Sequence, residues 1–98
     1  MKTIINSKLY DTERAEEIAT GIIRGPYYSW EMYENLYKKH TGEFFIERDF
    51  DGDGDCIEEY YWVLEHRFEP ISEEQAKVWV EKYCDADTYI KLFGEPKE

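Results

Sequence analysis

Apolar and polar positions along the first quarter of the chain predict a hairpin followed by a helix. The hairpin spans Ile4 to Tyr10, where two short β-prone pieces flank the polar pair Asn6-Ser7. Asp11 or Thr12 can then cap a helix, because the apolar residues that follow fall on one helical face, and Gly25-Pro26 ends it. That face consists of Ala15, Ile18, Ala19, Ile22 and Ile23.

The middle of the chain predicts a second hairpin and a later edge strand. The two strands of the hairpin are Leu36 to Lys39 and Glu43 to Glu47, and Gly42 in the turn between them can take a positive φ. Beyond the hairpin, Tyr60 to Leu64 is β-prone. Arg67 to Ile71 is typical of a strand at a sheet edge, where its proline is tolerated.

The last quarter of the chain predicts two helices. Ser72 begins a capping box, since Gln75 lies three residues later and can reach back to the backbone N–H of the cap. Asp85 or Asp87 starts a second, short helix, which the segment Gly94-Glu95-Pro96 ends. The apolar stripes are Ala76, Trp79, Val80, Tyr83 and Cys84 on the first helix and Tyr89, Ile90, Leu92 and Phe93 on the second.

These elements predict one α+β domain over residues 1–98. Strands and helices are mixed without a strict βαβ alternation, which favours a small antiparallel sheet covered by helices. We expect two hairpins plus an edge strand in that sheet, covered by an N-terminal helix and a C-terminal helix pair. The apolar fraction of 42% and the aromatic fraction of 17% are sufficient for a folded core in a chain of 98 residues.

Targeting and cysteine patterns indicate a soluble intracellular protein. No apolar run approaches the length of a membrane span, and the first ten residues lack the apolar core of a signal peptide. Cys56 and Cys84 make neither a disulfide framework nor a Cys-x-x-Cys zinc motif.

Negative charge is concentrated in one part of the chain. The net charge is −11, so we expect no direct binding to nucleic acid or to anionic membranes, and attraction to basic surfaces. The stretch from Glu43 to Glu59 contributes −7 of this charge, and Arg48 is its only basic residue. Its acids are Glu43, Glu47, Asp49, Asp51, Asp53, Asp55, Glu58 and Glu59.

The segment DFDGDGDCIEEY, Asp49 to Tyr60, partly matches the calcium loop of an EF-hand. Carboxylates occupy positions 1, 3 and 5, and Gly54 occupies position 6. Position 12 is Tyr60 instead of the bidentate glutamate, although Glu58 or Glu59 can substitute in an irregular loop. The preceding segment also predicts a strand where an EF-hand has a helix. We therefore predict no metal site and no cofactor, and the acids form either a solvated turn or a binding surface.

Residues with catalytic chemistry form no recognisable motif. A catalytic Cys-His pair would combine Cys56 or Cys84 with His40 or His66. No local sequence motif supports any of these pairings. Cys84 lies on an apolar helix stripe, where a buried inert thiol is the ordinary role. The sequence has no phosphate-binding glycine loop and no nucleophile elbow, so we expect that the protein is not an enzyme.

A similarity to known proteins lies in three segments: IINSKLYDTERAEEIA, ENLYKKHTGEFF and ISEEQAKVWVEKYCDADTYIKLFGE. They resemble a family of small acidic proteins from phages and other mobile elements of Firmicutes, some of which act as anti-CRISPR inhibitors. Two departures stand out. The family turn is usually Asn-Gly where this chain has Asn6-Ser7, and the glycine-rich loop after the second hairpin is replaced by the acidic DFDGDGDCIEEY.

The resemblance and the charge together favour an inhibitor in the cytoplasm of a bacterial host. The eight acids would substitute for phosphates and occupy a basic channel of a CRISPR effector nuclease or complex. The protein would act as a monomer or homodimer. The alternative is a calcium-binding or structural accessory protein of a mobile element that uses the loop from Asp49 to Asp55. If that loop is only a solvated turn, we expect the interface among the aromatic residues from Tyr27 to Tyr33. The sequence of this stretch predicts neither a helix nor a strand.

Overall fold

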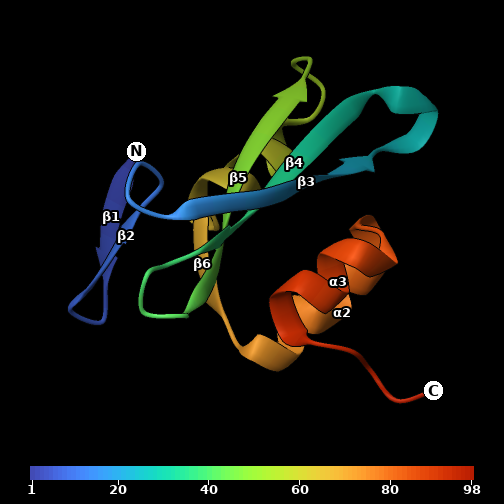
Figure 1. Ribbon diagram of the computed structural model, residues 1–98. Helices are drawn as coiled ribbons and strands as arrows, with labels where there is room; N and C mark the ends of the chain where they lie inside the picture. Colours follow the sequence, from blue (N-terminus) through green and yellow to red (C-terminus); the bar gives the residue numbers. More distant parts are fainter.

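The computed structural model describes residues 1–98 as an α+β fold with two antiparallel sheets and three helices (Figure 1). The smaller sheet pairs β1 (Lys2–Ile5) with β2 (Lys8–Asp11). The larger sheet has the order β3 (Glu16–Arg24), β4 (Trp30–Lys38), β5 (Phe44–Gly52) and β6 (Phe68–Ile71). The helices are α1 (Ile57–Glu65), α2 (Glu73–Tyr83) and α3 (Ala86–Phe93). None of the three has the length and apolar character needed to cross a membrane.

Both predicted hairpins are present. The first turns at Asn6-Ser7, with Ile5 opposite Lys8, but it forms its own small sheet instead of joining the larger one. The second connects β4 to β5, and Gly42 in its turn has φ +93°. The predicted edge strand is β6, which pairs only with β5 and carries Pro70.

The predicted N-terminal helix is wrong, because the chain from Glu16 to Arg24 forms strand β3. A β-bulge at Ile18 is the physical reason that the pattern misleads. Ile18 has no partner on β4, and both Ile18 and Ala19 pack against the core, so apolar residues lose the period of two that marks a strand. The β-branched residues and Gly21, a poor helix former, then favour the strand.

The β-prone stretch from Tyr60 to Leu64 is also not a strand, since it lies within helix α1. Its aromatic rings pack against residues of β5. Tyr60 contacts Phe50 of β5, and the Trp62 ring lies over the Arg48 guanidinium, 5.1 Å from its central carbon. Tertiary packing therefore overrides the local strand preference of the aromatic residues.

The C-terminal predictions are confirmed. Ser72 and Gln75 form the capping box of α2, and Asp85 caps α3, which ends at Gly94. The core between the sheet and α2 contains six buried residues: Leu36, Phe44, Ile46, Ala76, Trp79 and Val80. A smaller cluster of Tyr10, Tyr37 and Phe45 joins the first hairpin to the other face of the sheet.

Candidate functional site

The eight acids predicted at the interface divide into a paired group and a free group. Glu43 belongs to the paired group, since Lys8 Nζ donates to its Oε2 at 2.9 Å and the Thr41 hydroxyl donates to its Oε1 at 3.0 Å. The hydrogen bond from Lys8 lowers the pKa of the Glu43 carboxyl. This side chain fastens the turn between β4 and β5 to the first hairpin.

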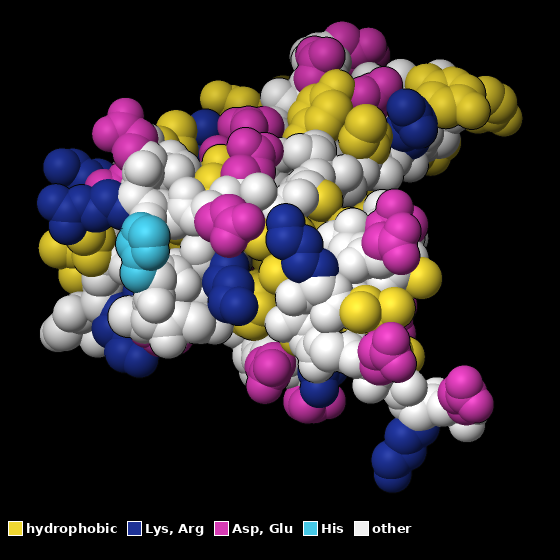
Figure 2. Space-filling view, viewed as in Figure 1, with side chains coloured by type: hydrophobic (Ala, Val, Ile, Leu, Met, Phe, Trp, Pro, Cys, Tyr) yellow, Lys and Arg dark blue, Asp and Glu magenta, His cyan; other side chains and the backbone are white.

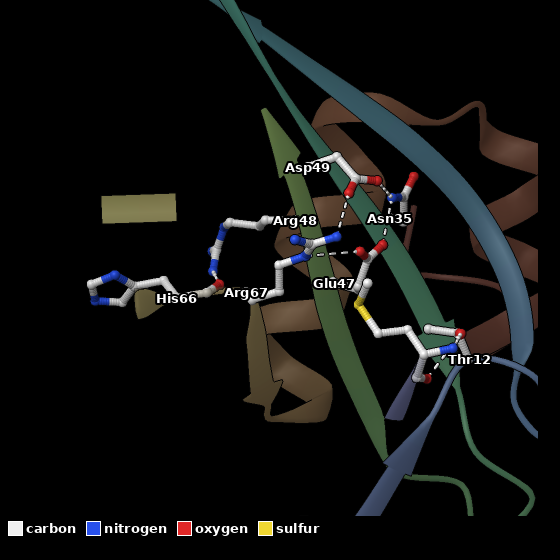
Figure 3. Close-up of polar contacts among 8 residues, drawn as sticks. Thr12, Asn35, Glu47, Arg48, Asp49, His66 and Arg67 are labelled. Atoms are coloured by element: carbon white, nitrogen blue, oxygen red, sulfur yellow. Dashed lines mark hydrogen bonds and ion pairs between the residues drawn. The ribbon is translucent and has the colours of Figure 1, made fainter. Parts of the chain in front are cut away.

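Glu47 and Asp49 belong to a polar network on the face of the sheet that the helices leave uncovered (Figure 3). Arg67 donates to Asp49 Oδ1 at 3.0 Å and to Glu47 Oε2 at 3.5 Å. Asn35 donates to Glu47 Oε1 at 2.9 Å and accepts from the Thr20 hydroxyl at 2.7 Å. The network links all three long strands, and Glu47 is only 6% exposed, so these two carboxylates hold the sheet together.

The free group lies where β5 ends and α1 begins. Its members form no ion pair with any Lys or Arg of the chain, and we call them the acidic end: Asp51, Asp53, Asp55, Glu58 and Glu59. Acidic side chains gather at this end of the sheet, with hydrophobic side chains beside them (Figure 2). Five uncompensated carboxylates in one place create a local negative potential.

The backbone of the acidic end is organised by the sequence itself. Asp53 Oδ1 accepts a hydrogen bond from the Asp55 N–H at 3.2 Å, which closes an Asx turn. Cys56 then occupies the N-cap position of α1, and Glu58 and Glu59 fall in its first turn, where the helix dipole favours negative charge. The acids of this loop therefore stabilise the start of α1, and their charges stay exposed to solvent.

Exposed aromatic residues surround the acidic end on two sides. Tyr27 and Tyr28, in the turn between β3 and β4, are 100% and 75% exposed. On α1 the exposed aromatic residues are Tyr60, Tyr61 and Trp62. Tyr27 and Tyr28 also take positive φ values of 54° and 56°, a conformation that costs a residue other than glycine about 1–2 kcal/mol. Strain and exposure at the same residues are typical of binding sites.

The β3–β4 turn and the loop before α1 lie side by side at one end of the sheet (Figure 1). The Cys56 thiol joins them, since its Sγ lies 3.7 Å from the Ser29 carbonyl oxygen. Tyr28, Asp51 and Asp53 line one shallow cavity. The two surfaces that the sequence offered as alternatives, the acidic loop and the aromatic stretch, are therefore one continuous surface.

Trp30 is held at this surface by a glycine. A Cβ at Gly25 would lie 2.2 Å from the indole nitrogen of Trp30, so the ring packs directly on the Gly25 backbone. The Gly25 N–H donates to the Trp30 carbonyl at 2.9 Å, which closes the β3–β4 turn. Only glycine permits this close approach.

The partial calcium motif is not arranged as an EF-hand loop. The segment before Asp49 is a strand, as predicted, but β5 continues to Gly52, so Asp49, at position 1, lies within the strand and accepts a hydrogen bond from Arg67. No group of three or more His, Cys, Asp or Glu side chains lies close enough together to hold a metal ion.

Both cysteines have the environment of structural thiols. Burial is the main cause that raises the pKa of Cys56 and of Cys84, and the nearby carboxylates Asp53 and Asp85 raise it further. A raised pKa keeps a thiol protonated, which is the opposite of what a nucleophile needs.

Sequence reasoning missed how the aromatic residues of α1 take part in the site. Their β propensity favours a strand, although acids before and inside the first turn of α1 are a helix-start signal. It also missed Arg67 and Asn35, whose contacts with Glu47 and Asp49 depend on strand register and leave no local signature.

Comparison with protein-family models, with curated proteins and with solved structures finds no match to this chain.

Proposed function

We propose that this protein is a small inhibitor that binds a basic, nucleic-acid-binding surface of a bacterial RNA-guided defence complex through the acidic end. The observation that carries the proposal is the set of five carboxylates without cationic partners, placed beside exposed aromatic residues. Basic channels that bind nucleic acid are lined by Arg and Lys, which carboxylates can pair with in place of phosphates.

The net charge of −11 supports charge mimicry of DNA or RNA. Electrostatic steering speeds the encounter of oppositely charged proteins, and charge pairs fix the register once they meet. Exposed Tyr27 and Tyr28 add the apolar anchors that dominate the energy of many protein interfaces.

The proposal narrows the interface predicted from the sequence. Glu43, Glu47 and Asp49 already satisfy Lys8, Asn35 and Arg67, so they support the sheet instead of pairing with a partner. The choice of an RNA-guided complex as the target follows from the resemblance of the sequence to proteins of mobile elements.

A pair of charge-matched variants tests the proposal. The acidic-end variant removes four charges while leaving the Asx turn of Asp53 intact: Asp51→Asn, Asp55→Asn, Glu58→Gln and Glu59→Gln. The control variant removes four exposed charges from α2 and α3: Glu73→Gln, Glu74→Gln, Glu81→Gln and Asp87→Asn. Both have a net charge of −7 instead of −11. Association with a panel of purified, guide-loaded RNA-guided nucleases is measured by biolayer interferometry, together with inhibition of target cleavage.

We expect the wild type to bind and inhibit at least one complex, and the control variant to behave similarly. The acidic-end variant should lose most of its association rate and its inhibition. Equal loss in both variants would show that only the total charge matters. Failure of the wild type to bind any complex of the panel would contradict the proposed target.

A further inference from the structure

A cavity of about 310 Å³ lies between β4 and the first two turns of α1, next to the acidic end. Five side chains line it: Trp30, Met32, Glu58, Glu59 and Trp62. Two indole rings and a thioether form apolar walls, and two carboxylates provide the only polar side chains.

The two glutamates of the cavity have no partner within the chain. Neither carboxylate forms an ion pair or accepts a side-chain hydrogen bond, whereas Glu34, Glu43 and Glu47 elsewhere all do. The cavity therefore places two carboxylates that have no cationic partner next to aromatic side chains. A cation with a planar, weakly hydrated head group complements both features, and the arginine guanidinium is such a group.

The chain already places a guanidinium over the Trp62 ring. The Arg48 guanidinium lies 5.1 Å from the Trp62 ring centroid while it donates to Glu34 at 2.9 Å and to Glu69 at 3.0 Å. Two carboxylates compensate the charge of Arg48, so it does not prevent a second cation from binding in the cavity. His66 stacks on Trp62 with ring centroids 4.2 Å apart, which holds the indole in place.

We propose that this cavity binds an arginine side chain of the partner protein, with the guanidinium paired to Glu58 and Glu59 and the side-chain stem against Trp30, Met32 and Trp62. The inference rests on the proposed function for the source of the arginine, since a basic nucleic-acid-binding surface supplies such side chains. It assigns a specific recognition role to two of the five free carboxylates.

The cavity is tested without any partner protein by titrating the ¹⁵N-labelled chain with N-acetyl-arginine methylamide at constant ionic strength. Each of the three tryptophans gives one indole N–H signal in a ¹⁵N–¹H spectrum. Trp79 serves as an internal reference, because it does not line the cavity and its Nε1 donates to the buried Glu34 at 3.1 Å. The neutral isostere N-acetyl-citrulline methylamide and N-acetyl-lysine methylamide are the comparison probes.

We expect the arginine amide to shift the Trp30 and Trp62 signals with one saturable Kd of about 1–10 mM, the range expected for a single side chain. The Trp79 signal should not move. Citrulline should bind about tenfold more weakly, because the charge-assisted hydrogen bonds are lost. Lysine should also bind more weakly, since its ammonium is neither planar nor bidentate.

A matched pair of variants assigns the carboxylates. Glu58→Gln with Glu59→Gln should weaken binding of the arginine amide about tenfold. Glu73→Gln with Glu74→Gln, which removes two acids from the first turn of α2, should leave binding unchanged. A Trp79 signal at its wild-type position verifies that each variant is folded. The comparison of the arginine, citrulline and lysine amides uses the wild-type chain, so it does not depend on the folding of any variant.

Three results would overturn the inference: no saturable shift of Trp30 and Trp62, equal binding of arginine and citrulline, or an unchanged Kd in the Glu58/Glu59 variant. Equal binding of lysine would overturn the guanidinium assignment. Failure of the cavity leaves the proposed function standing if the acidic end still binds a defence complex. Failure of the proposed function is seen only in the partner assay.

Discussion

Asn6 and Ser7 turn the first hairpin with φ values of 51° and 66°. Positive φ at both central residues is the feature of a type I′ turn, which prefers Asn-Gly because glycine has no Cβ to clash with the backbone. Asn6 tolerates this conformation, but Ser7 does not do so readily. The position therefore contains removable strain.

Ser7→Gly should stabilise the fold. Relief of the left-handed conformation gains about 1–2 kcal/mol, and the extra freedom of glycine in the unfolded chain opposes it by about 0.4–1 kcal/mol. The net gain is about 0.5–1 kcal/mol, which raises the Tm of a domain of this size by a few degrees. Thermal unfolding followed by circular dichroism measures it. Ser7→Ala keeps the Cβ and should give no gain, and a lower Tm for the glycine variant would contradict the strain argument.

The contacts of buried charged residues could not be predicted from the sequence. Glu34 is 8% exposed, and it accepts from Trp79 Nε1 at 3.1 Å and from Arg48 Nε at 2.9 Å. Arg48 counted in the sequence only as the single base in an acidic stretch, and Trp79 only as a core residue. Their contact joins α2, β4 and β5, and it depends on side chains 45 and 14 residues apart. No local sequence pattern indicates contacts between residues so far apart in the chain.

At the scale of elements, those with local signals were predicted and those without were not. The capping box of α2, the cap of α3 and the turn at Gly42 are determined by neighbouring residues, and all three are present. Strand β3 was missed because its bulge hides the period of two. Helix α1 was missed because its aromatic residues favour strands until they pack on Phe50 and Arg48.

The candidate site was predictable only in part. The sequence identified all five residues of the acidic end, because their charge is a local property. It did not separate them from Glu43, Glu47 and Asp49, since the pairing of those acids with Lys8, Asn35 and Arg67 requires the assembled sheet. The cavity with Trp30 and Trp62 likewise exists only once α1 packs against β4.

The capping box of α2 gives a prediction at this scale. Ser72 Oγ accepts from the Gln75 N–H at 3.1 Å, and Gln75 Oε1 accepts from the Ser72 N–H at 2.9 Å. Ser72→Ala should lower the free energy of unfolding by about 1 kcal/mol, whereas Ser72→Gly should lower it by only a few tenths of that. Urea unfolding measures both. An alanine variant as stable as the wild type would show that packing of Trp79 and Val80 alone determines where α2 begins.

For the whole molecule, repulsion among the acids opposes folding. The Cα trace extends over 44 × 35 × 19 Å. The Debye length is about 30 Å at 0.01 M salt and about 8 Å at 0.15 M, so acids across most of the molecule repel one another only at low salt. Exposed ion pairs such as Lys8–Glu43 also weaken with salt, but each contributes little. The buried pair Arg48–Glu34 is screened much less.

Salt should therefore have opposite effects on folding and on partner binding. Raising NaCl from about 0.01 M to about 0.15 M should raise the Tm, because the repulsion is screened, and should slow association with a basic partner. The acidic-end variant and its charge-matched control both have a net charge of −7, so the Tm of both should depend less on salt than that of the wild type. Only the acidic-end variant should lose association. Scanning calorimetry and biolayer interferometry on the same three proteins measure the two effects. A Tm that falls as salt rises would mean that ion pairs outweigh repulsion, and a matched loss of association in both variants would mean that the position of the acids has no role.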